Sequence, residues 1–323
     1  MGEEYDPERE SSYIIEWDAN SLYASVMVEE LPIGHFRWAS DKVLKDLEKS
    51  LRCGEGLPSI KAAFLCVDLD YPEDLHNLHN DYPLAPEKVL INGVEKLAPN
   101  LGNKKEYHTS YELLLFYLKK GLILKKVHRA ITCKTSAFLK PYIDFCAEKR
   151  REAKKRKDKF RDEYWKLAGN AVYGKTFEGV RDRCNTKFVG GGERERLTGL
   201  FSQPNFIGSC VLPGTNIVMV QMGKVSVKLN KPIYLAATIL DKNKRDMAEF
   251  HYDYVLEKWG KERATLEFSD TDILTYHIMT DDVYKDMLPD LEKRFDTSKY
   301  PEDHPSGIPK GVNAGAIGGI FKD

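Results

Sequence analysis

Apolar and polar residues at the start of the chain follow the pattern of a strand that leads into a helix. Residues 13–17 are rich in β-branched and aromatic side chains, and residues 18–21 form an Asp-Ala-Asn-Ser cluster typical of turns and helix N-caps. An apolar run follows at residues 22–28. The pattern predicts a strand, a turn and a short helix, and it predicts that Pro32 and Gly34 end this segment.

Residues 35–130 mix strand and helix signals. Residues 60–70 alternate between apolar and polar like a strand, and residues 110–120 are apolar enough to form a helix. Prolines at positions 72, 83, 86 and 99 interrupt the pattern. We interpret this stretch as an insertion with both α and β structure.

The longest helical pattern covers residues 138–173 and predicts two helices. One apolar stripe runs along its second part with helical spacing and consists of Phe160, Tyr164, Leu167 and Ala171. The opposite faces carry many charged residues.

Strand signals return in the last part of the chain. Residues 190–230 contain a glycine triplet, two proline loops and a β-like run at 216–220, which predicts an insertion that contains a hairpin. Residues 232–259 predict a helix, and two strands are predicted at 264–268 and 273–278. The Ser-Asp-Thr-Asp sequence between these strands predicts a β-hairpin with an acidic tip. The fold class predicted from these elements is α+β.

The composition excludes several classes of protein. The chain has 323 residues, of which 42% are hydrophobic and 31% are charged, so it can bury a large core and need not be disordered. The formal net charge of -1 excludes a uniformly basic nucleic-acid coat but permits a local basic site. No run of 18 apolar residues is present and the N-terminus is acidic, which predicts no membrane association and no export.

Six cysteines are scattered singly along the chain: Cys53, Cys66, Cys133, Cys146, Cys184 and Cys210. They form no CxxC pair and have no histidine at zinc spacing. This predicts core thiols in a reducing, intracellular compartment rather than metal ligands or disulfides. The nucleus, the mitochondrion and a viral factory all satisfy that prediction.

Three aspartates at the ends of predicted strands are candidates for metal binding. Asp18 closes an apolar strand, where a charge is costly to desolvate unless a cation meets it. Asp270 and Asp272 are two residues apart, so in an extended chain both project to one side. Two such acidic ends side by side would hold a pair of hard cations, which lie about 3.5–4 Å apart in two-metal phosphoryl-transfer sites. The alternative is that each aspartate only forms a turn.

A strongly basic segment lies within the predicted helices. Residues 149–166 include ten basic and four acidic residues, an excess of six positive charges. Helical spacing predicts one shared face for Arg150, Lys154, Lys157 and Arg161, and another for Lys166, Asn170 and Tyr173. Cations suit phosphates and an aromatic ring suits a base or a sugar, so the segment is a candidate nucleotide site. The alternative is a solvated charged face with Tyr173 in the core.

Residues 169–176 match the phosphate-binding P-loop pattern GxxxxGK[ST]. A true P-loop needs a buried strand before the glycine-rich turn. Residues 159–168 instead show the pattern of a charged amphipathic helix. We therefore interpret the match as fortuitous and expect no ATP hydrolysis.

Taken together, three segments resemble the sequence motifs of protein-primed family B DNA polymerases, the group found in linear phages, adenoviruses, linear plasmids and Maverick/Polinton elements. Residues 18–23 resemble motif A (DxxSLYPS), residues 166–174 resemble motif B (KxxxNSxYG), and residues 269–272 resemble motif C (DTDS). Further similar stretches lie at residues 31–36, 79–88, 231–234, 295–298 and 319–323. The resemblance covers nearly the whole chain.

The resemblance implies a role for each matched residue. The catalytic carboxylates would be Asp18, Asp270 and Asp272, and two Mg²⁺ ions, or Mn²⁺ in their place, would bind Asp18, Asp272 and the Ala19 carbonyl. The nucleotide would contact Tyr23, Arg150, Lys154, Lys166, Asn170 and Tyr173. The DNA would contact Ser21, Gly174 and Lys175. The implied partners are a DNA template and primer, deoxynucleoside triphosphates and a terminal (priming) protein.

The resemblance also implies a division into domains. A palm with an antiparallel sheet and packed helices would comprise residues 1–34 and 229–323, and helical fingers would comprise residues 131–179. Two insertions, at residues 35–130 and 180–228, would correspond to terminal-protein regions 1 and 2. On this division we expect no counterpart of the family's exonuclease and thumb within these 323 residues.

Motifs A, B and C each depart from the family pattern at one position, where Ala24 replaces proline and Ala171 and Ile273 replace serine. None of these changes removes an expected metal ligand. The function implied is template-directed DNA synthesis. The alternative is a truncated, inactive remnant that only binds DNA or a protein partner. A reverse transcriptase is disfavoured because its paired aspartates are adjacent, whereas Thr271 separates these two.

Overall fold

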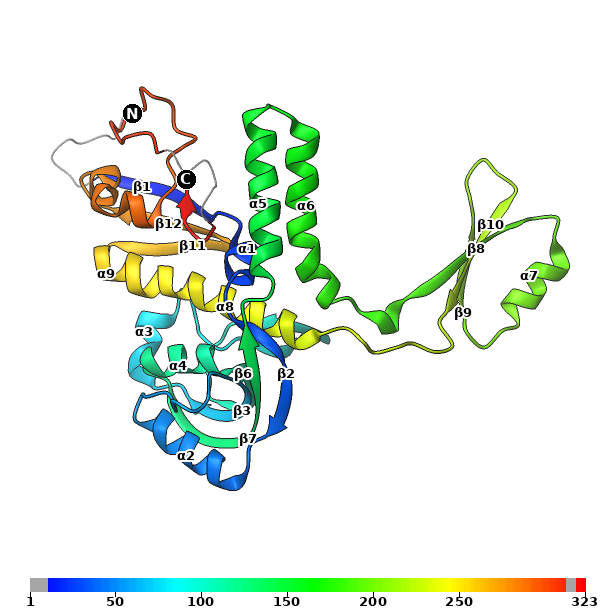
Figure 1. The fold of residues 1–323 in the computed structure, drawn as a ribbon, viewed down its shortest axis with the longest axis horizontal. Coiled ribbons are helices and arrows are strands. Elements are labelled where there is room, and N and C mark those ends of the chain that lie inside the picture. The colour runs from blue at the N-terminus through cyan, green and yellow to red at the C-terminus, as the bar shows by residue number, and fades with distance from the viewer. Residues whose placement is uncertain (1–10, 312–317) are drawn as a thin grey trace. The chain divides into compact units, whose positions relative to one another are not determined.

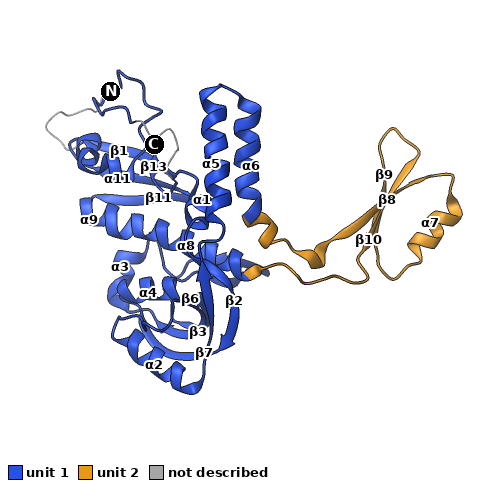
Figure 2. Cartoon of the chain, in the orientation of Figure 1, with its two compact units in different colours: residues 1–172, 234–323 blue, residues 173–233 orange. Residues whose placement is uncertain are grey.

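The computed structural model describes residues 11–311 and 318–323, and these residues form a mixed α and β fold with antiparallel sheets (Figure 1). The chain divides into two compact units (Figure 2). The first unit comprises residues 1–172 and 234–323, and the second comprises residues 173–233. The predicted α+β fold class is confirmed.

One four-stranded sheet of the first unit, which we call the first sheet, has the strand order β11-β12-β1-β13. Its antiparallel strands are β1 (Ser12–Ala19), β11 (Ala264–Asp270), β12 (Ile273–Met279) and β13 (Phe321–Lys322). The strand predicted at residues 13–17 and the acidic hairpin are confirmed. Ile15, Trp17 and Ala19 alternate into the core beneath this sheet, where Trp17 is fully buried among other aromatic rings.

A second four-stranded sheet of the same unit, which we call the second sheet, has the order β2-β7-β3-β6. Its antiparallel strands are β2 (Leu31–Trp38), β3 (Ala62–Asp70), β6 (Lys104–Ser110) and β7 (Ile123–Ser136). Apolar residues of α2 (Asp41–Arg52) and α4 (Tyr111–Lys119) join its core. The strand predicted at 60–70 and the helix predicted at 110–120 are confirmed.

The prediction that Pro32 and Gly34 end the first strand-turn-helix segment is wrong, because both residues lie within β2. β2 is an edge strand of the second sheet and pairs only with β7. Proline is tolerated on an edge strand because the side of the strand that lacks an N–H group can face solvent, where no neighbouring strand needs a hydrogen-bond donor. Register shifts lie on both sides of Gly34, whose φ of 139° suits glycine.

One long helical segment lies between the two sheets (Figure 1). Its side chains belong to the cores of both sheets. It consists of α8 (Ile233–Phe250), a π-helical turn (His251–Val255) and α9 (Leu256–Trp259). Met247 and Phe250 belong to the core of the first sheet, whereas Ala248 and Tyr252 belong to the core of the second. The helix predicted at residues 232–259 is confirmed, and it joins the two sheets.

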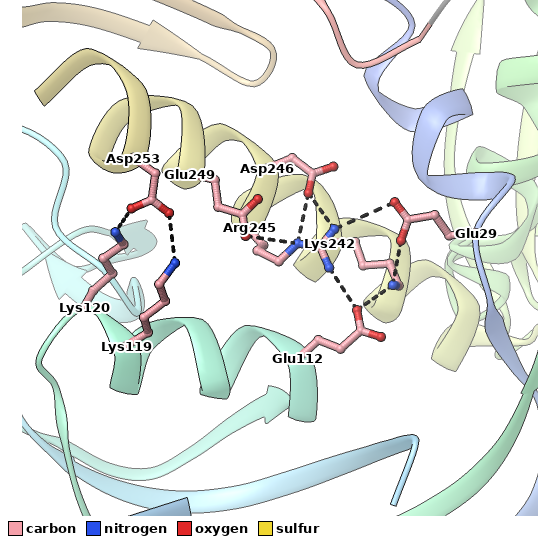
Figure 3. A network of polar contacts seen from close by, with 9 residues as sticks. All are labelled: Glu29, Glu112, Lys119, Lys120, Lys242, Arg245, Asp246, Glu249 and Asp253. Carbon is pink, nitrogen blue, oxygen red and sulfur yellow. Dashed lines mark hydrogen bonds and ion pairs between the residues drawn. The ribbon is translucent and has the colours of Figure 1, made fainter. Parts of the chain in front are cut away.

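A network of charged side chains lies between α8, α4 and the segment that follows α1 (Leu22–Met27) (Figure 3). Lys242 on α8 is 5% exposed, and its Nζ lies 2.8 Å from Glu29 Oε2 and 2.5 Å from Glu112 Oε2. Arg245 is paired with Glu112 and with Asp246. These ion pairs connect the shared helix to the core of the second sheet.

Two antiparallel helices, α5 (Lys140–Lys155) and α6 (Lys159–Thr176), confirm the two helices predicted at residues 138–173 (Figure 1). They belong to the first unit up to residue 172. The Phe145 and Trp165 rings meet edge to face with their centroids 5.4 Å apart. The Tyr142 hydroxyl donates a hydrogen bond to the Ala168 carbonyl at 3.2 Å. These contacts hold the helices side by side.

The face predicted for four cations is wrong. Arg150 and Lys154 lie on α5, but Arg161 lies on α6, and Lys157 lies in the turn between them with a left-handed φ of 55°. A helix that ends at residue 155 cannot continue the i, i+4 spacing to Lys157 and Arg161.

The apolar stripe on α6 identifies the helix correctly but is not buried within the chain. Phe160, Tyr164 and Leu167 are 79%, 53% and 68% exposed. Trp165, one position away from the stripe, makes the ring contact with α5 instead.

The second unit contains a three-stranded antiparallel sheet of order β8-β10-β9 (Figure 2). Its elements are a 3-10 turn (Val180–Asp182), β8 (Cys184–Gly190), α7 (Arg194–Phe201), β9 (Phe206–Val211) and β10 (Ile217–Gly223). The predicted hairpin is confirmed, whereas α7 was not predicted. Its small core consists of Val189, Leu197, Leu200, Val220 and Met222.

The remaining elements of the first unit are short. They are a 3-10 turn (Glu73–Leu75), α3 (His76–His79), the hairpin strands β4 (Glu87–Ile91) and β5 (Val94–Ala98), α10 (Val283–Met287), a 3-10 turn (Leu288–Asp290) and α11 (Leu291–Arg294). Among the residues that the structure describes, no helix has the length and the apolar character needed to cross a membrane.

All six cysteines are free, as predicted. Cys66 and Cys146 are buried, but Cys53, Cys184 and Cys210 are exposed. The prediction of core thiols is therefore wrong for these three, which lie outside the cores of the two units.

Candidate functional site

A cleft of about 680 Å³ in the first unit is lined by the end of β1, the helices α1, α5 and α6, the β11-β12 turn, and Asp296, Ser298, Lys299, Gly318 and Lys322. Nine of the residues predicted for the site line it: Asp18, Ala19, Ser21, Tyr23, Arg150, Lys154, Lys166, Asn170 and Asp272. Segments far apart in the sequence thus place most of the candidate site in one cleft.

Strand pairing brings Asp18 and Asp272 together. Asp18 lies opposite Ile273 in the β1-β12 register, and the Ala19 N–H donates a hydrogen bond to the Asp272 carbonyl at 2.8 Å. Burial, followed by the nearby Asp18 carboxylate, raises the pKa of Asp272. The two carboxylates are therefore close enough to repel each other.

Asp270 does not share this position. It is the last residue of β11, is exposed, and does not line the cleft. Its Oδ1 accepts a hydrogen bond from the Thr271 hydroxyl at 3.0 Å. The expectation that Asp270 and Asp272 project to one side is wrong, because Thr271 has a left-handed φ of 53° and breaks the extended alternation.

The cleft also contains a cation that the sequence motifs do not indicate. Lys322 on β13 pairs with Asp18 across the sheet, and its Nζ lies 2.5 Å from Asp18 Oδ2. The resemblance marked residues 319–323 as family-like but assigned no role to Lys322. Lys299 and the buried Asp296 line the same cleft and were also missed.

The wall opposite the carboxylates is basic. Arg150 on α5 is held by Asp162 on α6, with Nε 2.8 Å from Oδ1. Burial, followed by the Arg150 charge, lowers the pKa of Lys154. Lys166 and Asn170 lie one helical turn apart on α6 and are exposed. The cleft therefore has an acidic end on the strands and a basic wall on two helices.

Three predicted residues lie elsewhere. Tyr173, Gly174 and Lys175 are on the last turn of α6, belong to the second unit and do not line the cleft. All of residues 169–176 are helical, so the segment has no phosphate-binding loop. The interpretation of the P-loop match as fortuitous is confirmed.

The cleft fits divalent cations that are shared with a substrate. Within residues 11–311 and 318–323, no three carboxylate, histidine or cysteine side chains form a complete metal cage. Asp18 and Asp272 nevertheless offer hard oxygen ligands, and Mg²⁺ commonly binds through one or two carboxylates plus substrate phosphates. The repulsion between these carboxylates, and the lysine ammonium already held by Asp18, show that the site attracts positive charge.

Comparison with known proteins identifies the fold. Phi29 DNA polymerase in an orthorhombic crystal form is similar with a TM-score of 0.51 over 98% of this chain and 44% of that chain, at 13% sequence identity. Phi29 DNA polymerase complexed with primer-template DNA and incoming nucleotide substrates is similar with a TM-score of 0.50 over 88% and 42% of the two chains, at 16% identity. The chain thus spans less than half the length of these polymerases.

No curated protein sequence matches the chain. The sequence profile of the family described as DNA polymerase type B, organellar and viral, matches residues 7–255, which is more than half of the 323 residues. The matched residues include the segments that resemble motifs A and B, whereas the segment that resembles motif C, residues 269–272, follows the matched range. The chain therefore belongs to the type B DNA polymerases of organelles and viruses.

Proposed function

We propose that this chain carries the polymerising centre of a family B DNA polymerase. In this proposal it transfers a deoxynucleotide, on a template, to a primer 3′-hydroxyl or to the hydroxyl of a protein primer. One observation carries the proposal: a single cleft joins two carboxylates at neighbouring strand ends to a basic wall on two helices. Phosphoryl transfer depends on this combination, because catalysis consists mainly of positioning and of electrostatic stabilisation.

Asp18, Asp272 and the Ala19 carbonyl would hold two Mg²⁺ ions, or Mn²⁺ in their place. When bound, these ions neutralise the charge that develops on the transferred phosphate and on the leaving pyrophosphate. The chain contributes fixed positions: the pairing of β1 with β12 keeps both carboxylates at the same end of these two inner strands of the first sheet. Because neither carboxylate is fully exposed, each interacts with a cation more strongly than it would in water.

The nucleotide would lie between the acidic end and the basic wall. Arg150, Lys154 and Lys166 line the cleft from two helices and would bind the triphosphate. Asn170, one turn beyond Lys166, would add an amide contact to the nucleotide. Tyr23 on α1 lines the cleft beside Asp18 and would close on the sugar, where a ring excludes a 2′-hydroxyl.

Other roles extend the proposal beyond the cleft. Tyr173 would pack on the nascent base pair, and Ser21, Gly174 and Lys175 would contact DNA. Asp270 would act as an auxiliary carboxylate through its charge, which also helps to raise the pKa of Asp272. These roles are supported by the family motifs that contain the residues.

The domain division would follow the same family. Residues 1–34 and 229–323 would form the palm and residues 131–179 the fingers. Residues 35–130 and 180–228 would be the insertions that meet a terminal protein and the template. The similar Phi29 DNA polymerase is complexed with primer-template DNA and incoming nucleotide substrates, which supports the same partners here.

Primer extension tests the proposal. The purified chain is incubated with a primed DNA template, the four deoxynucleoside triphosphates and Mg²⁺, beside an Asp272→Asn variant with the same fold by circular dichroism. We expect extension by the native chain and at least about a thousandfold slower extension by the variant, because a lost metal ligand removes several kcal/mol of transition-state stabilisation. Equal products from both proteins would contradict the proposal and favour a remnant that only binds DNA or a protein partner.

A further inference from the structure

Lys322 and Asp18 form an ion pair inside the cleft. The Lys322 Nζ lies 2.5 Å from Asp18 Oδ2, and the two side chains are only 20% and 33% exposed. An ion pair with this degree of burial is screened less by salt than a surface pair. The Asp18 carboxylate therefore already holds a cation that belongs to the chain itself.

The backbone around Lys322 fixes this contact. Lys322 lies directly opposite Asp18 in the antiparallel pairing of β13 with β1. The Asn20 N–H donates to the Ile320 carbonyl at 2.8 Å, and the Asp296 N–H donates to the Phe321 carbonyl at 2.7 Å. Because these backbone bonds flank Lys322, its place beside Asp18 does not depend on the ion pair alone.

The charges around the pair show what the lysine does. Asp272 lines the same cleft as Asp18 and Lys322, and its carbonyl accepts a hydrogen bond from the Ala19 N–H at 2.8 Å, so two carboxylates lie near this ammonium. Arg150, one of the cations on the basic wall, is already paired with Asp162. Lys322 therefore offsets part of the repulsion between the two carboxylates when no other cation is present.

We propose that Lys322 is a built-in counter-ion of Asp18, which holds this carboxylate in the metal-free protein and must release it when a divalent cation binds. The proposal rests on the proposed function, in which Asp18 binds metal. Lys322 is then a positioning residue that acts through Asp18 and sets the metal affinity of the empty cleft. Lys322 lowers the affinity of the cleft for a divalent cation for two reasons. The incoming ion must displace the ammonium group from Asp18, and it is repelled by the positive charge of that group.

Mn²⁺ binding to the full chain, without DNA or nucleotide, tests this role. Free Mn²⁺ is measured by its electron paramagnetic resonance signal during titration of the native protein and of Lys322→Gln. We expect Lys322→Gln to bind Mn²⁺ about tenfold more tightly, which is the change that loss of one partly buried ion pair produces. Glutamine keeps a polar chain of similar length, and the flanking backbone bonds preserve β13.

Three further variants separate the specific contact from general charge. Lys299→Gln removes the same charge from the same cleft without removing the partner of Asp18, and we expect a change below about twofold. Lys322→Arg keeps the charge and is expected to keep the native affinity. In an Asp18→Asn background, Lys322→Gln is expected to have no further effect. Thermal unfolding of each variant checks that it is folded.

The Mn²⁺ titrations distinguish failure of the counter-ion role of Lys322 from failure of the proposed metal site. Equal affinity in the native protein and Lys322→Gln, weaker binding in Lys322→Gln, or equal tightening in Lys299→Gln would overturn the counter-ion role while leaving the metal site in place. Absence of Asp18-dependent Mn²⁺ binding from every variant would overturn the proposed metal site and, with it, this inference.

Discussion

Asp68 in the second sheet and Asp272 at the end of the first sheet have opposite surroundings, and their pKa values shift in opposite directions. In the second sheet, Asp68 Oδ1 accepts a hydrogen bond from the Glu106 N–H at 2.8 Å and lies 2.8 Å from His128 Nε2, and both contacts lower the pKa of Asp68. In the first sheet, burial and the Asp18 carboxylate raise the pKa of Asp272. A carboxylate supplied with donors stabilises the fold, whereas one left short of them is suited to bind a ligand.

The largest effect is expected where the two sheets are joined, at Lys242. Lys242→Met leaves Glu29 and Glu112 without this ammonium and is expected to lower the free energy of unfolding by about 3 kcal/mol. Lys119→Met is the control, because Lys119 is 69% exposed and its Nζ lies 3.5 Å from Asp253 Oδ2 (Figure 3). We expect the control to cost less than about 0.5 kcal/mol. Urea unfolding measures both, and equal losses would show that the network does not join the sheets.

The second largest effect is the pH dependence of stability that is expected from two buried, neutral histidines, His251 and His79. His251 and Tyr276 share a hydrogen bond of 2.9 Å, and burial lowers the pKa of His251 to about 3. His79 shares a hydrogen bond of 2.8 Å with Tyr71, and burial lowers its pKa to about 4. Since a histidine in the unfolded chain titrates near pH 6.5, the unfolded state takes up protons first as the pH falls.

The stability that comes from keeping His251 and His79 neutral is therefore fully present above about pH 6.5. It is lost as the pH falls toward the pKa values of these histidines in the folded protein. Each histidine contributes a slope of up to about 1.4 kcal/mol per pH unit. Between pH 6.5 and 5.0 we expect the native protein to lose about 2 kcal/mol more than a His251→Gln variant. Urea unfolding at these two pH values measures the difference. The same pH dependence in both proteins would contradict the neutral, buried state of His251.

The smallest effect tests the contrast between Asp68 and Asp272 itself. Asp68→Asn is expected to lower the free energy of unfolding by about 1 kcal/mol, because it weakens the contacts with Glu106 and His128. Asp272→Asn is expected to raise it by about 0.5–1 kcal/mol in the presence of a chelator, because it removes repulsion from Asp18, an effect limited by partial exposure. Opposite signs are the expected result, and a loss of stability in both variants would contradict the contrast.

Helices and strands could be predicted from the sequence where the pattern within a short stretch determines them, but not where they depend on pairing with distant residues. The α5-α6 pair and the β11-β12 hairpin follow from helical and alternating patterns within short stretches, and both were predicted. β2 was missed because Pro32 and Gly34 are typical of turns, and only its position at a sheet edge makes them acceptable. β13 has two residues, too few for any pattern, and it exists through its pairing with β1.

The candidate site shows the same limit. The resemblance to the family motifs implied one site for Asp18, Asp272 and Lys166, and the structure lines one cleft with all three. The prediction that Asp270 projects to the same side as Asp272 was wrong, because the direction of Asp270 depends on the backbone angle φ at Thr271. Lys322 was missed because the strand pairing that places it beside Asp18 joins opposite ends of the chain, and no local pattern records that contact.

The most direct test of the metal site is to locate bound Mn²⁺ in crystals of this chain soaked with Mn²⁺ and a deoxynucleoside triphosphate. Anomalous diffraction is predicted to show Mn²⁺ in contact with carboxylate oxygens of both Asp18 and Asp272, with the Lys322 ammonium moved away from Asp18. Mn²⁺ bound instead at Asp68 or Asp270, with Asp18 still paired to Lys322, would contradict the account.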